Sequence, residues 1–137
     1  MKRLSAILIT IFVTISLCAC SGGISGDEAK THINEFLAAV EAEDYELATT
    51  FFHPDQTENL EVYFGMLKDW HGVDFSDVEI VRYTGFSSSY YNSTVDGSIY
   101  QLRMDATVSG TSVAMEIEIV KNDNGYGIYN IEVTPTR

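Results

Sequence analysis

An α+β domain is the fold that the sequence predicts, with helices in its first half and an antiparallel sheet in its second. Apolar residues recur with a helical period of about 3.6 residues as far as Gly72. After Gly72 they alternate with polar residues, which is typical of strands with one solvated face. Turn-forming segments, above all Asn122–Gly125, divide this second half into four strands. Helices followed by an antiparallel meander are the pattern of an α+β domain.

Two helices are expected first. Ser25 and Glu28 form a capping box, in which each side chain accepts a backbone N–H at the helix start. The apolar face that follows comprises Ala29, Ile33, Phe36, Leu37 and Val40. Asp44 is expected to cap a second, short helix that Pro54 ends, because proline cannot continue a helix.

A third helix is expected to end near Gly72. Its cap signature is Asp55 followed by Glu58, and its apolar stripe comprises Leu60, Tyr63, Phe64, Leu67 and Trp70. Gly65 lies within this helix and costs about 1 kcal/mol relative to alanine.

The first strand is expected to begin at Val78 and to end near Gly85. Residues 86–98 are rich in Ser, Tyr and Asn, and we predict a long loop there. The remaining strands are expected at residues 100–108, 113–119 and 126–133.

Residues 1–19 have the pattern of a secretory signal peptide. Lys2 and Arg3 precede an apolar run over residues 4–17. A spanning helix needs roughly 20 apolar residues, so this run is short for a permanent anchor and we expect it to be removed. Both cysteines, Cys18 and Cys20, lie at its end, and the domain that follows must therefore be stable without disulfides.

The stretch Leu17-Cys18-Ala19-Cys20 resembles the lipobox of bacterial lipoproteins, although that family usually has Ala, Ser or Thr where Cys18 stands. The resemblance implies that Cys20 carries a diacylglyceryl group and becomes the first mature residue. Two acyl chains anchor a protein stably, so we expect an extracytoplasmic protein on the outer face of the cell membrane. A flexible tether over residues 20–26 would then lead to a single domain over residues 27–137.

The formal net charge of −12 repels phosphate backbones, so we expect no nucleic-acid partner. The three histidines show no ligand-like spacing, and Asn122–Tyr126 lacks the glutamate that completes a calcium loop. The sequence therefore predicts no metal site. It contains no Gly-rich phosphate loop and no Ser-His-Asp set, and no cofactor is expected.

Paired N-terminal helices that end in residues 43–48 and 51–55, followed by a meander closed by residues 125–131, look like the nuclear-transport-factor-2-like superfamily. The resemblance covers roughly residues 27–134. It implies a curved antiparallel sheet that wraps the helices into a cone, whose open end can hold a small ligand. The strand pair that often separates the early helices in enzymes of this group is not recognisable in this sequence.

Two classes of function remain open. A module without catalytic residues that binds a small ligand or a surface protein is favoured, and the alternative is an enzyme resembling ketosteroid isomerase or polyketide cyclase. Such an enzyme needs a base and a hydrogen-bond donor near a carbonyl group. The candidate bases are His53, His71 and Asp105, and the candidate donors are Tyr63, Tyr83 and Tyr100. Both histidines are more simply explained as residues at helix C-termini, where they favour the helix dipole.

The residues proposed to contact a ligand or partner are Phe86, Tyr90, Tyr91 and Tyr100. Tyrosine offers amphipathic contact area at low entropic cost. The aromatic residues of the predicted loop have no period that would bury them, so they either meet a partner or cover the open end of the cone. We expect the domain to be a monomer.

Overall fold

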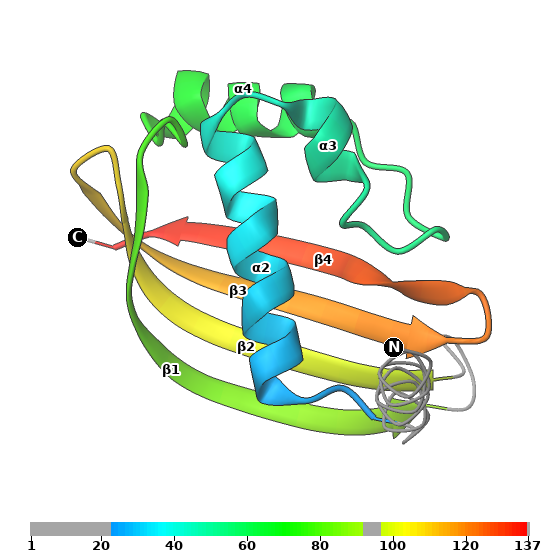
Figure 1. Ribbon diagram of the computed structural model, residues 1–137. Helices are drawn as coiled ribbons and strands as arrows, with labels where there is room; N and C mark the ends of the chain where they lie inside the picture. The colour runs from blue at the N-terminus through cyan, green and yellow to red at the C-terminus, as the bar shows by residue number, and fades with distance from the viewer. Residues whose placement is uncertain (1–22, 92–96, 137) are drawn as a thin grey trace, which may run out of the picture.

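The computed structural model of the protein describes residues 23–91 and 97–136, apart from the side chains of residues 90 and 91. In this part of the chain, the helices α2 (Gly26–Glu41), α3 (Tyr45–Thr49) and α4 (Leu60–His71) precede the strands β1 (Val78–Tyr91), β2 (Gly97–Val108), β3 (Thr111–Asn122) and β4 (Gly125–Pro135). The strands form one antiparallel sheet in the order β1-β2-β3-β4. The sheet curves around α2, which crosses its concave face, and α4 lies on the β4 side (Figure 1). The predicted α+β fold is confirmed.

The core lies between α2 and the concave face of the sheet. All five residues of the predicted α2 stripe are buried. Alternate residues of the two central strands face them: Leu102, Met104, Ala106 and Val108 from β2, and Val113, Met115, Ile117 and Ile119 from β3. Burying a Leu or Ile side chain contributes about 1.5–3 kcal/mol, so this alternation decides which face of the sheet receives the helix.

The helix ends are set by local side chains. Ser25 Oγ accepts the Glu28 N–H at 3.1 Å and so caps α2 as predicted. Gly72, with φ of 65°, ends α4 as predicted, because a left-handed residue favours glycine. The cap of α4 is Asn59 rather than Asp55, since an asparagine side chain directly before the first helical residue reaches the orphan N–H groups. Trp70 is 72% exposed and does not belong to the buried stripe.

The prediction of a loop over residues 86–98 is wrong at both ends, because β1 continues to Tyr91 and β2 begins at Gly97. Residues 86–91 pair with residues 97–102 in regular antiparallel register. Register shifts between Ile80 and Arg82 and between Tyr83 and Gly85 interrupt the alternation of β1. Each bulge moves the side chains after it to the opposite face of the sheet. The apolar and polar residues of the sequence therefore stop alternating regularly, although the strand continues.

The described end of the expected tether packs against the domain. Ile24 is buried in the core cluster, Ser25 caps α2 and Gly26 is its first residue. Within the described residues, packing therefore extends at least to Ile24, which precedes the expected boundary by three residues.

The segment after α3 pairs with the start of β4. Ile128 donates its N–H to Phe51 O and accepts the His53 N–H, both at 2.8 Å, and Phe52 forms a parallel bridge with Ile128. These bonds explain why α3 ends at Thr49, well before Pro54. Gly127 allows the close approach, because a Cβ atom there would collide with the backbone of Phe52 and His53.

Candidate functional site

An open groove of about 630 Å³ lies between the start of α2 and the β1–β2 half of the sheet. Its main lining residues are Ile24, Gly26, Lys30, Tyr83, Phe86 and Tyr100. Small-ligand pockets usually measure about 300–1,000 Å³, so the groove has a suitable size. By comparison, the hollow around Arg103 and Glu116 on the outer face of the sheet measures about 190 Å³.

Two stacked rings form the apolar wall of the groove. Phe86 pairs with Leu102 across the strands and therefore lies on the concave face, diagonally beside Tyr100. Their ring centroids are 6.0 Å apart and the rings are nearly parallel, with an interplanar angle of 6°. Tyr100 is 7% exposed, whereas Phe86 is 71% exposed. The stack thus supports a large apolar side chain that remains open to solvent.

Close packing of Tyr100 under α2 shapes the floor of the groove. A Cβ atom at Gly26 would lie 3.0 Å from Tyr100 Oη, which is tighter than ordinary van der Waals contact. Glycine at the first position of α2 therefore lets the helix start sit directly over the Tyr100 hydroxyl.

Lys30 brings a positive charge to the groove. Its Nζ lies 4.6 Å from the centroid of the Tyr83 ring, within the range of a cation–π contact. Burial raises the pKa of Tyr83, partly offset by a hydrogen bond with Asn34, so this phenol is neutral at physiological pH. The groove therefore combines flat apolar surface with one ammonium group.

The proposed contact residues are placed as follows. Phe86 and Tyr100 meet in this groove. Tyr90 and Tyr91 end β1, and their side chains lie outside the described residues, as does Cys20.

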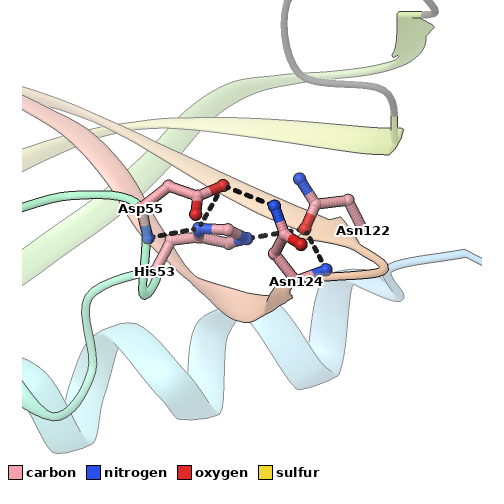
Figure 2. Close-up of polar contacts among 4 residues, drawn as sticks. All are labelled: His53, Asp55, Asn122 and Asn124. Atoms are coloured by element: carbon pink, nitrogen blue, oxygen red, sulfur yellow. Dashed lines mark hydrogen bonds and ion pairs between the residues drawn. The ribbon is translucent and has the colours of Figure 1, made fainter.

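A second polar centre surrounds His53, which is completely buried (Figure 2). His53 Nδ1 accepts the Asp55 N–H at 3.1 Å, so the ring proton lies on Nε2 and is donated to Asn122 Oδ1 at 2.9 Å. Asn124 completes the cluster by donating its N–H to Asn122 Oδ1 and its side-chain amide to Asp55 Oδ2. His53 Nε2 and the Asp55 carboxylate therefore fasten the α3–α4 connection to the β3–β4 turn, and His53 Nδ1 holds the connection itself in place.

This geometry corrects the interpretation of His53 as a helix C-terminal residue. Helix α3 ends at Thr49, and His53 instead joins two loops from inside the protein. His71 does have the expected position, as the exposed last residue of α4.

The structure does not bring the candidate bases to the candidate donors in the groove. Tyr83 and Tyr100 line it, but His53, His71 and Asp105 do not. Asp105 is on the outer face of the sheet, where its Oδ2 accepts a hydrogen bond from Arg82 Nε at 2.8 Å. Tyr63 Oη donates to Ile131 O at 3.3 Å on the α4 side.

Sequence reasoning missed Lys30 and Ile24 as residues of the groove. A signal for Lys30 was present, because it is the single basic residue in the range of α2 apart from histidine. Ile24 gave no comparable signal, since one apolar residue between glycines and serines has no period.

Within residues 23–91 and 97–136, no group of three or more His, Cys, Asp or Glu side chains is arranged to hold a metal ion. Among the same residues, no helix has the length and hydropathy needed to span a membrane.

No protein-family model, no curated protein and no solved structure matches this chain. Its helices packed on a curved, four-stranded antiparallel sheet are compatible with the nuclear-transport-factor-2-like α+β fold.

Proposed function

We propose that this protein is an extracytoplasmic lipoprotein of the nuclear-transport-factor-2-like superfamily, whose domain binds a small ligand in the groove between α2 and β1–β2. One observation carries the proposal: Phe86 is 71% exposed, yet it is held flat on Tyr100 in a groove of ligand size. An exposed aromatic ring on a rigid support is suited to binding, because little conformational entropy is lost when a ligand covers it.

The groove lies close to the proposed anchor. Ile24 lines the groove, and only four peptide steps separate it from Cys20. An extended chain covers about 14 Å in four residues, so a lipid on Cys20 would hold the groove near the membrane surface. The domain would then meet its ligand at or near the bilayer.

Binding is better supported than isomerase or cyclase chemistry. A proton transfer needs a base within hydrogen-bond reach of the substrate. The groove is lined by two candidate donors, Tyr83 and Tyr100, but by none of the three candidate bases. The buried ring of His53 is occupied at both nitrogens.

A fluorescent probe tests the binding site. The lipid-free mature chain, residues 20–137 carrying Cys20→Ser, is titrated with the uncharged aromatic probe N-phenyl-1-naphthylamine. We expect saturable binding that Phe86→Ser weakens about tenfold, which corresponds to roughly 1.4 kcal/mol of lost ring contact.

The matched control is Val81→Ser, since Val81 is also an exposed apolar residue of β1 but does not line the groove. It should leave the affinity unchanged. Equal affinity of the wild type and Phe86→Ser, or no saturable binding at all, would refute the proposed site. Equal weakening by both substitutions would do the same.

The anchor is tested separately in cells. Cys20→Ala should release the full-length protein from the membrane fraction and abolish labelling by a fatty-acid analogue. Cys18→Ala should change neither result, because only Cys20 has the position of the modified residue. Labelling that persists in Cys20→Ala rules out lipid attachment at this cysteine.

A further inference from the structure

We propose that the groove selects ligands that carry one anionic group beside a flat apolar body, with Lys30 as the residue that recognises the anion. The inference rests on the proposed ligand-binding function and names the class of its ligand. It follows from how charge is distributed around α2.

The charge of Lys30 has an unusual partner. Three other basic residues in the described part of the chain pair with carboxylates: Arg82 with Asp105 at 2.8 Å, Arg103 with Glu116 at 3.0 Å and Lys68 with Asp74 at 3.6 Å. Lys30 has no carboxylate within 4.0 Å among the described residues, and its ammonium lies over the Tyr83 ring instead. A neutral ring leaves the charge uncompensated, so an anion can still bind there.

Three of the four acidic residues of α2 line a hollow that is separate from the groove. Asp27, Glu28 and Glu35 line a separate hollow together with His32 and Tyr126. The groove itself has no acidic lining residue, although the chain has a net charge of −12. Helix α2 thus contributes one cation and no carboxylate to the lining of the groove.

The flat wall and the cation belong to the same groove and suit different parts of one ligand. The ring of Phe86, backed by Tyr100, offers its exposed face to an aromatic or otherwise planar group. Lys30 offers a charge to a carboxylate, sulfonate or phosphate on the same molecule. A small aromatic acid satisfies both requirements, whereas a neutral aromatic compound satisfies only the first.

The negative charge elsewhere on the protein does not cancel this preference. At physiological ionic strength, charges farther apart than about 8 Å are largely screened in water. The nearest charge in the groove therefore dominates, and it is positive. The preference should weaken as salt is added, because Lys30 is only partly buried.

Two probes that differ by one sulfonate test the inference. The lipid-free mature chain is titrated with 8-anilinonaphthalene-1-sulfonate and with N-phenyl-1-naphthylamine, which has the same aromatic system without the charge. Lys30→Gln should weaken binding of the sulfonate about five- to tenfold and leave the neutral probe within about twofold. Lys30→Arg should retain sulfonate binding, because it keeps the charge.

Lys68→Gln is the matched control, since it removes the same charge from a site outside the groove. It should change neither affinity. For the wild type, raising NaCl from about 0.15 M to about 0.5 M should weaken binding of the sulfonate and not of the neutral probe. This second measurement needs no substitution and is independent of the stability of any variant.

The inference is overturned if Lys30→Gln affects both probes equally, if Lys68→Gln has the same effect, or if salt does not weaken binding of the sulfonate. In these cases binding of the neutral probe would still support the groove as a binding site. If neither probe binds, the proposed function and the inference both fail, so the two failures are distinguishable.

Discussion

Tyr126 and His53 both place polar atoms in the interior, but only those of His53 have hydrogen-bond partners. In the described part of the chain, Tyr126 Oη is buried and makes no hydrogen bond. Its ring packs edge-on against His32, with centroids 4.9 Å apart. Burial, together with the negative charge of Glu28, raises the pKa of Tyr126 to about 12.

We expect Tyr126→Phe to raise the free energy of unfolding by about 1 kcal/mol, because it removes an unpaired buried hydroxyl and keeps the ring. Urea denaturation measures the change. Tyr63→Phe is the control of opposite sign, since Tyr63 Oη donates to Ile131 O and its loss should destabilise the protein. A destabilised Tyr126→Phe variant would show that the hydroxyl has a partner.

The same residue predicts a dependence of stability on pH. The pKa of Tyr126 is about 12 in the folded protein and about 10 in the unfolded chain. Between these values the unfolded chain releases the proton first, so stability should fall as pH rises from 10 towards 12. Tyr126→Phe should show a smaller fall over this range. Thermal melts of both proteins at several alkaline pH values test this difference.

His53→Phe should lower the free energy of unfolding by about 2 kcal/mol or more. The ring volume is largely kept, but the Asp55 N–H and Asn122 Oδ1 lose their bonds to the imidazole. His71→Phe is the matched control, because His71 is exposed at the end of α4 and should change stability by less than about 0.5 kcal/mol. Equal melting temperatures for the two variants would contradict the fastening role of His53.

The two edge strands of the sheet, β1 and β4, are protected in different ways. Residues 51–53 and Tyr63 bond to the outer edge of β4. Strand β1 has two register shifts, which twist the edge and interrupt the row of pairing groups. Both devices disfavour pairing with another chain.

Gly127→Ala should destabilise the protein by about 3 kcal/mol, because the added methyl group collides with the backbone of residues 52 and 53 and separates them from β4. Gly65→Ala is the contrasting substitution. Gly65 lies within α4 with open space at its Cβ position, so alanine there should stabilise by about 1 kcal/mol. Chemical denaturation of the two variants should give changes of opposite sign, and a tolerated Gly127→Ala would disprove the close approach.

The packed part of the domain includes residues that precede α2. Ile24 belongs to the core cluster, and Ser25 supplies the cap of α2. The described residues that precede α2 and the groove are therefore parts of one structure.

A chain that starts at Asp27 should be less stable than one that starts at Gly23 by about 2 kcal/mol or more. The shorter chain loses a buried isoleucine and a helix cap, each of which contributes about 1 kcal/mol or more. Differential scanning calorimetry measures the difference, and a chain that starts at Ile24 serves as control. Identical melting temperatures for all three chains would show that residues 24–26 add nothing to the fold.

The lipid-free mature chain should be a monomer with a melting temperature that reductant does not change. Its sheet edges are protected, its net charge is strongly negative and residues 21–137 contain no cysteine. Size-exclusion chromatography with light scattering measures the mass. A mass that doubles with concentration would show that one sheet edge pairs with a second copy.

Features that depend on neighbouring residues were determined by the sequence. The period of α2, the alternation of β2 and β3, the Ser25 cap, the Gly72 stop and the turn at Asn122–Gly125 all follow from side chains within a few positions of one another. The apolar face of the helices and the apolar face of the sheet must both be buried, and they are buried by packing against each other. The α+β class follows from this packing.

Only the tertiary structure decided the length of β1 and the site. Residues 86–91 are held as a strand by pairing with β2, and bulges hide that pairing from any period in the sequence. His53 is buried because residues 122–128 cover it from a distant part of the chain. Lys30, Phe86 and Tyr100 share a groove because α2 crosses the sheet where the β1–β2 register stacks the two rings. Packing between distant segments sets these positions. Sequence patterns therefore allowed Phe86 and Tyr100 to be predicted as contact residues, but not the presence of Lys30 beside them.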